Sequence, residues 1–139
     1  MRGINERGAF VMELIRGSHN VRARHRGAIV TLGSFDGLHL GHQALIRTAL
    51  ERGAREQRPV ILLSFEPLPR EYLQSADPPA RLTNFRERWR ILQSLGLDAL
   101  MLLRFDESLR LQSGAQFVEL LTSTLEVGGL VVGHDFRFG

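Results

Sequence analysis

The hydrophobic residues of this chain fall into two patterns that alternate along the sequence. Runs that are apolar at nearly every position predict strands buried on both faces, and they cover residues 28–32, 60–65, 98–105 and 130–132. Between these runs, apolar residues recur at intervals of three or four, which predicts amphipathic helices. One predicted helix covers residues 43–55, a second runs from Asn84 to near Gly96, and a third runs from Ser113 through Leu125.

This alternation predicts the α/β class, with a Rossmann-like, doubly wound parallel sheet and helices on both of its faces. In such a sheet, ligands bind outside the carboxyl ends of the strands. The loops that follow the four predicted strands begin at residues 33, 66, 106 and 133, and they contain the unusual residues of the chain. We therefore expect the functional site at that edge of the sheet.

Composition narrows the class of protein. A chain of 139 residues that is 43% hydrophobic suits one globular domain. The absence of cysteine excludes disulfides, thiolate zinc sites and a cysteine nucleophile, and it fits a cytoplasmic protein. All 18 basic residues are arginines, scattered along the chain, and the net charge is only +3. This distribution predicts no nucleic-acid partner, and no run is long enough to predict a membrane span.

The segment 33–42 carries the clearest chemistry. His39 and His42 flank Gly41 at a predicted turn from strand to helix. Glycine lets the backbone approach a ligand closely, and a helix N-terminus attracts anions. Two imidazoles there suit a triphosphate. Zinc is the rival reading, although no third ligand is evident, and we expect His19 and His25 to be structural or surface residues.

A family resemblance rests on four stretches. Residues 33–42, Gly-Ser-Phe-Asp-Gly-Leu-His-Leu-Gly-His, resemble the nucleotidyltransferase signature G-x-F-D-x-x-H-x-G-H. Residues 64–71 read Ser-Phe-Glu-Pro-Leu-Pro-Arg-Glu, residues 80–83 read Ala-Arg-Leu-Thr, and residues 131–139 read Val-Val-Gly-His-Asp-Phe-Arg-Phe-Gly. Together they resemble the N-terminal FMN adenylyltransferase (FAD synthetase) module of the bacterial bifunctional riboflavin kinase/FAD synthetases.

The resemblance implies a reaction and a set of site residues. ATP and FMN would be the substrates, FAD and pyrophosphate the products, and Mg²⁺ would be carried mainly by the ATP phosphates, with no certain protein ligand. The implied catalytic residues are His39 and His42. The implied ATP-binding residues are Gly33, Ser34, Phe35, Asp36, His39, Gly41, His42, Asp135 and Phe138. The implied FMN-binding residues are Phe65, Pro67, Pro69, Arg70 and Phe136.

Domain boundaries follow from the same resemblance. Residues 1–11 are expected to be a disordered extension, and residues 12–139 to form the adenylyltransferase domain. The family continues with another strand and helix, a Ser-Ser/Thr-x-x-Arg motif and a β-barrel riboflavin kinase domain. We therefore expect a C-terminally incomplete domain with weak or no activity alone.

Plainer readings stay open. The chain is alternatively another adenylyl- or cytidylyltransferase of the same superfamily, or a non-catalytic nucleotide-binding module. Asp36 is alternatively a brace or cap of the turn, and Phe65 a core residue. Pro67 and Pro69 alternatively only stiffen a loop.

Overall fold

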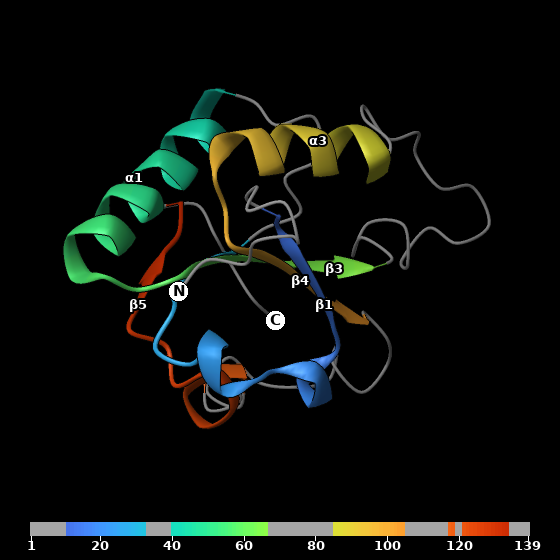
Figure 1. Ribbon diagram of the computed structural model, residues 1–139, viewed down its shortest axis with the longest axis vertical. Helices are drawn as coiled ribbons and strands as arrows, with labels where there is room; N and C mark the ends of the chain where they lie inside the picture. Colours follow the sequence, from blue (N-terminus) through green and yellow to red (C-terminus); the bar gives the residue numbers. More distant parts are fainter. Residues whose placement is uncertain (1–10, 33–39, 67–84, 105–116, 119–120, 134–139) are drawn as a thin grey trace.

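Five strands form one parallel sheet. The computed structural model describes residues 11–32, 40–66, 85–104, 117–118 and 121–133. The strands are β1 (Glu13–Arg16), β2 (Ile29–Leu32), β3 (Val60–Glu66), β4 (Ala99–Arg104) and β5 (Gly129–Val131). Their order across the sheet is β1-β4-β3-β2-β5 (Figure 1), and every neighbouring pair is parallel. The predicted α/β class with a parallel sheet is confirmed.

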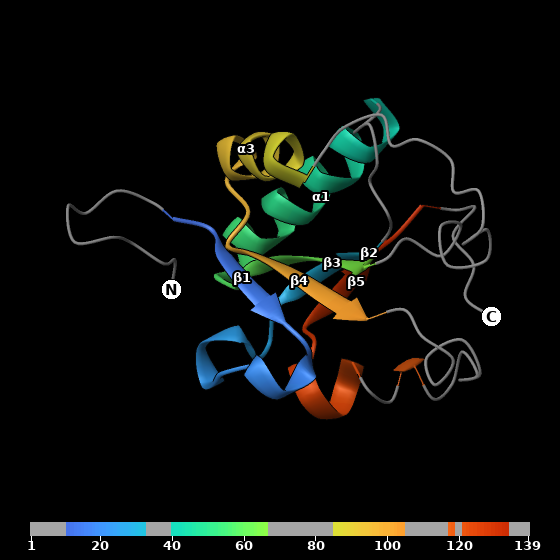
Figure 2. The same cartoon turned by 90° about the vertical axis from the view of Figure 1, so that its right-hand side faces the viewer.

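Both faces of the sheet are covered. The helices α1 (Leu40–Glu56) and α3 (Phe85–Leu95) lie side by side on one face, as Figure 2 shows. The short helical turns η1 (Ser18–Asn20), η2 (Ala23–His25) and η3 (Leu121–Leu125) lie on the opposite face. This arrangement explains why the central strands are apolar at nearly every position, because successive side chains point into two different cores.

Alternate residues of each central strand belong to the two cores. Ile29 of β2 and Leu62 of β3 pack toward α1 and α3. Val30 and Leu63 pack toward the other face, against Leu125 and its neighbours. Trp89 of α3 is partly buried and packs against the core under the helices. The sheet is therefore the rigid middle layer of the molecule.

The strand β1 was not predicted. Its sequence, Glu-Leu-Ile-Arg, is short and places charges at both ends, unlike the continuous apolar runs of the other strands. Ile15 is buried, whereas Leu14 is partly exposed, because β1 lies at the edge of the sheet and pairs only with β4. The expected extension, residues 1–11, lies outside the described residues except for Val11.

Two predicted helices differ in detail from the structure. The helix expected over residues 43–55 begins three residues earlier, at Leu40. The helix expected to run through Leu125 is a π-helix at Leu121–Leu125. Leu121 and Leu125 are both buried in the core on that side of the sheet. Residues 113–116 and 119–120 lie outside the described residues.

Candidate functional site

Two of the candidate segments leave the sheet from neighbouring strands. β2 and β5 pair in parallel, with Thr31 opposite Val131. Segment 33–42 follows β2 directly, and segment 133–139 begins two residues beyond the end of β5. Because the pairing is parallel, both segments start at the same edge of the sheet and at nearly the same height.

The position of β2 in the sheet is equally informative. From β2 the chain moves to β3 and β4 on one side, and it then returns to the other side of β2 to form β5. The gap between the carboxyl ends of β2 and β5 is therefore a topological switch point, where open α/β sheets bind their ligands. Figure 2 shows the arrowheads of β2, β3 and β5 directed toward the same side of the molecule.

The first turn of α1 contains part of the histidine motif. The helix begins at Leu40, so the backbone of Gly41 and His42 is helical. The N–H groups of a first helical turn have no partner within the helix, and the helix dipole adds partial positive charge there. The motif thus combines a helix N-terminus with the carboxyl end of β2, which is an arrangement suited to anions.

Most predicted site residues lie outside the described residues. The structure places the backbone of Phe65 near the end of β3, and that of Gly41 and His42 in α1. Those outside the described residues are Gly33, Ser34, Phe35, Asp36, His39, Pro67, Pro69, Arg70, Asp135, Phe136 and Phe138. The structure therefore tests where these segments begin, and their side-chain roles stay predictions.

Two polar residues that the sequence reasoning missed lie at the same edge. Thr31 of β2 is 0% exposed and Ser64 of β3 is 1% exposed. Their hydroxyl oxygens are buried without a hydrogen-bond partner among the described residues. In the sequence, each of these residues is the hydroxyl residue within an otherwise apolar run. That pattern alone does not indicate a site, because Thr and Ser also occur as ordinary strand residues.

His25 is a structural residue, as expected. The N–H of Arg22 donates to Nδ1 of His25 at 2.9 Å, so the ring proton lies on Nε2, which faces Oε2 of Glu13 at 3.2 Å. Arg24 donates to both carboxylate oxygens of Glu13, at 2.9 and 2.7 Å. That guanidinium lowers the pKa of the Glu13 carboxyl. The segment that carries Arg24 and His25 is thus tied to β1 through Glu13, and His25 is buried.

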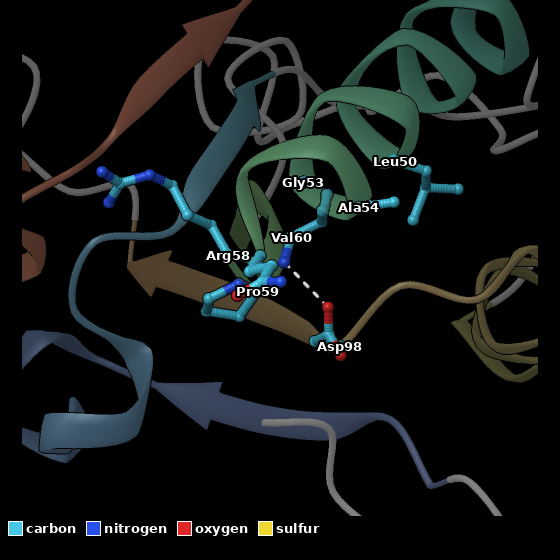
Figure 3. Close-up of a pocket in the computed structure, with 8 residues that line it drawn as sticks. Leu50, Gly53, Ala54, Arg58, Pro59, Val60 and Asp98 are labelled. Atoms are coloured by element: carbon cyan, nitrogen blue, oxygen red, sulfur yellow. Dashed lines mark hydrogen bonds between the residues drawn. The ribbon is translucent and has the colours of Figure 1, made fainter.

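A cavity of about 240 Å³ lies at the opposite edge of the sheet. It is lined by α1 residues such as Gly53 and by the starts of β3 and β4, as Figure 3 shows. Asp98 accepts a hydrogen bond from the N–H of Val60 at 2.8 Å there. None of the predicted site residues lines this cavity, so its contacts belong to the scaffold.

The described residues offer no metal cage. No group of three or more His, Asp or Glu side chains among them is arranged to hold a metal ion. His39 lies outside the described residues, so the Mg²⁺ that the resemblance implies and the zinc alternative both stay predictions.

The family follows from comparison with known proteins. A protein-family model described as FAD synthetase matches residues 21–139, which include β2 through β5 and both candidate segments. The chain belongs to the FAD synthetase family. Within this family assignment, the histidine motif after β2 and the aromatic segment after β5 are parts of one matched domain.

Curated relatives carry a two-part name. The chain is 42% identical over 130 residues to the bifunctional riboflavin kinase/FMN adenylyltransferase of Escherichia coli strain K12, and the match covers 92% of this chain and 42% of that protein. The protein of the same name from Pseudomonas fluorescens is 42% identical over 129 residues, with 92% and 41% covered. The one from Buchnera aphidicola strain APS is 37% identical over 129 residues, with the same coverage. The chain thus spans less than half the length of these relatives.

A solved structure shares the fold. The crystal structure of a protein named as a macrolide-efflux protein, from Streptococcus pneumoniae, matches with a TM-score of 0.79 and 25% identity, and it covers 93% of this chain and 51% of that chain. The likeness bears on the α/β fold, and the efflux name belongs to the matched protein alone. In the part of this chain that the structure describes, no helix is long and apolar enough to cross a membrane.

Proposed function

We propose that this domain transfers AMP from ATP to FMN, giving FAD and pyrophosphate. The observation that carries the proposal is the pairing of β2 with β5, because it starts the two most distinctive segments of the family at one switch point. The FAD synthetase model covers both segments, and relatives at 42% identity are named FMN adenylyltransferases. A cytoplasmic location remains part of the same proposal.

The proposed chemistry is a direct displacement. An oxygen of the FMN phosphate attacks the α-phosphorus of ATP, a new P–O bond forms, and the bond to the β-phosphate bridging oxygen breaks. Pyrophosphate leaves with that electron pair, and no covalent enzyme intermediate forms. The protein then acts by positioning the two phosphates in line and by stabilising the negative charge that develops.

The histidine motif supplies the positive side of this site. We assign the ATP phosphates to the imidazoles of His39 and His42, beside the amino end of α1. Both imidazoles would donate to phosphate oxygens as charge develops in the transition state. Mg²⁺, when bound to the ATP phosphates, neutralises part of their charge.

The remaining residues divide between the two substrates. Residues 33–36, Gly41, Asp135 and Phe138 are assigned to the nucleotide, because they belong to the two segments that follow the paired strands β2 and β5. Phe65, near the end of β3, belongs to the FMN side. The other proposed FMN contacts are Pro67, Pro69, Arg70 and Phe136.

The first test combines binding with turnover. Purified protein is incubated with ATP, FMN and Mg²⁺, FAD is separated by chromatography, and quenching of FMN fluorescence is titrated in parallel. We expect flavin binding that ATP strengthens, and FAD as the flavin product, formed at the low rate that the sequence predicts for this chain alone. His42→Ala is expected to lower the rate by about 10²–10³-fold, the usual loss for a transition-state donor.

The matched control is His19→Ala. His19 is an exposed histidine in η1, so its removal should leave both flavin binding and turnover unchanged. Adenylyl transfer to another phosphorylated acceptor, with no binding of FMN, would contradict the assignment of substrate. Full turnover by the His42→Ala variant would contradict the role given to this residue.

A further inference from the structure

The face of the sheet beneath α1 and α3 has an aliphatic core. Its buried residues on β2, β3 and β4 include Ile29, Val60, Leu62, Leu100 and Leu102. Thr31 follows Ile29 by two positions and Ser64 follows Leu62 by two, so both point toward the same helices. Both are fully buried, and neither hydroxyl oxygen has a hydrogen-bond partner in the part of the chain that the structure describes.

These hydroxyls are costly for the fold alone. A buried polar group without a partner retains its desolvation penalty, whereas an apolar group of the same shape has none. Valine in place of Thr31 and alanine in place of Ser64 would fill nearly the same space among aliphatic neighbours. Two such groups, on adjacent strands and on the same face of the sheet, therefore indicate a requirement other than stability of the ligand-free chain.

Their position points to the nature of the missing partner. Thr31 lies opposite Leu62 in the pairing of β2 with β3, so Ser64 lies one pleat further toward the carboxyl edge. Both hydroxyls face the helical layer that contains α1, and this helix begins near the carboxyl edge, at Leu40. Hydroxyl groups and the unpaired N–H groups of a first helical turn are all donors. Their common complement is an anion rich in acceptor oxygens.

We propose that Thr31 and Ser64 are further nucleotide-binding residues, whose hydroxyls donate to phosphate oxygens beneath the amino end of α1. This inference rests on the proposed adenylyl transfer and deepens it by adding two residues from the sheet itself. Both oxygens are shielded from water in the ligand-free chain, so the nucleotide-bound arrangement supplies the partners that the described residues do not. The desolvation penalty of the two unpaired hydroxyls in the free protein is then offset by their hydrogen bonds to the bound nucleotide.

The test separates stability from binding. Thr31→Val and Ser64→Ala are made singly and together, thermal unfolding is followed without ligand, and the affinity for ATP with Mg²⁺ is titrated. We expect each single variant to be as stable as the wild type, or more stable, when free. We expect each to bind ATP about tenfold or more weakly, because a hydrogen bond to a charged group is lost. Thr31→Ser, which keeps the hydroxyl, should restore affinity.

Two hydroxyls that already have partners provide matched controls. Oγ1 of Thr48 donates to the carbonyl oxygen of Ala44 at 3.0 Å, and Oγ of Ser94 donates to that of Ile91 at 2.7 Å. Thr48→Val and Ser94→Ala should therefore leave ATP affinity unchanged. These substitutions remove the same atoms from residues that lie away from the switch point.

Each outcome decides between the two proposals. If the wild type forms FAD and the Thr31 and Ser64 variants bind ATP as tightly as it does, this inference is wrong and the proposed function stands. If the wild type binds neither ATP nor FMN, both are wrong. A loss of free-state stability with unchanged ATP affinity would show that the hydroxyls serve the fold.

Discussion

The two edges of the sheet differ in the hydrogen bonds that their polar side chains make to the backbone. At the amino edge, Asp98 accepts from the N–H of Val60 at 2.8 Å, and its own N–H donates to the carbonyl of Val60 at 3.0 Å. The Arg58 guanidinium donates to the carbonyl oxygen of Gly27 at 2.9 Å. At the carboxyl edge, the buried hydroxyls of Thr31 and Ser64 have no partner among the residues that the structure describes.

This difference separates stability from function within one layer of the molecule. The amino edge is closed by short hydrogen bonds between side chains and backbone, and none of the predicted site residues lines its cavity. The carboxyl edge gathers the starts of the candidate segments and retains unsatisfied donors. The position of a cavity would not have located the candidate site, because the 240 Å³ cavity of Figure 3 lies at the amino edge of the sheet.

The largest expected effect comes from breaking the amino edge at Asp98. Asp98→Ala removes the acceptor of the Val60 N–H and leaves that buried donor unpaired. We expect a loss of about 2–3 kcal/mol in the free energy of unfolding, measured by urea denaturation. Affinity for ATP, titrated in native conditions, should not change.

Asp98→Asn is the control for this substitution. It keeps an acceptor oxygen and nearly the same shape, so its loss of stability should be clearly smaller than that of Asp98→Ala. Equal stability of the alanine variant and the wild type would show that the Asp98–Val60 contact contributes little. If Asp98→Ala lost ATP affinity without losing stability, the amino edge would contribute to binding, contrary to the difference drawn between the two edges.

A smaller effect is expected at Gly53, where α1 crosses the start of β3. A Cβ there would lie 2.9 Å from the carbonyl oxygen of Arg58 and would also meet the Cγ2 methyl of Val60. Helix propensity alone predicts that Gly53→Ala stabilises the protein by about 1 kcal/mol. Because backbone must move to admit the methyl group, we expect a net loss of about 1–2 kcal/mol instead.

Thermal and urea unfolding of Gly53→Ala measure this balance. Ala54→Gly, at the neighbouring exposed position of α1, should lose about 1 kcal/mol through propensity alone. A stabilised Gly53→Ala variant would mean that the amino edge has room for a methyl group. The contact between helix and sheet would then be looser than the structure indicates.

The smallest effect concerns Glu13 on β1. Its hydrogen-bonded Arg24 lowers the pKa of the carboxyl, so the carboxylate stabilises the folded state above the pKa it has in the unfolded chain. That contribution is lost as the pH falls through the lowered, folded-state pKa. Glu13→Gln should therefore lower the melting temperature slightly at neutral pH.

The pH dependence of that gap is the measurement. Melting temperatures of the wild type and Glu13→Gln should converge as the pH falls through the lowered pKa of the Glu13 carboxyl. The gap at neutral pH should also shrink in high salt, because the Arg24 side chain is largely exposed. A gap that is constant from neutral to acid pH would show that charge does not contribute.

Sequence patterns predicted the central part of the fold well. The apolar runs that became β2, β3 and β4 are buried on both faces, so hydrophobicity alone revealed them. The hydrophobic pattern did not predict β1, because this short edge strand has only one buried residue and carries the charged residues Glu13 and Arg16 at its ends. The early start of α1 was hidden by Gly41, which has low helix propensity yet is tolerated in a first turn.

The candidate site was predictable only in its location. The order of strands and loops located it at the carboxyl edge, and the sheet order then showed which two segments are neighbours. Sequence could not reveal the unsatisfied hydroxyls of Thr31 and Ser64, because a missing hydrogen bond depends on three-dimensional packing. The individual contacts of His39, Asp135 and Phe136 stay predictions.

The matched register of β2 and β5 has a consequence for protein engineering. Adding or deleting one residue within β2, which has four residues, or within β5, which has three, would shift the start of the following loop by about 3.3 Å. The residues beyond that point would then turn their side chains to the opposite face of the sheet. Exchanging the connecting loops as cassettes would leave both exits where they are. New specificities are therefore best sought by grafting loops onto these two strands, with the length of each strand held constant.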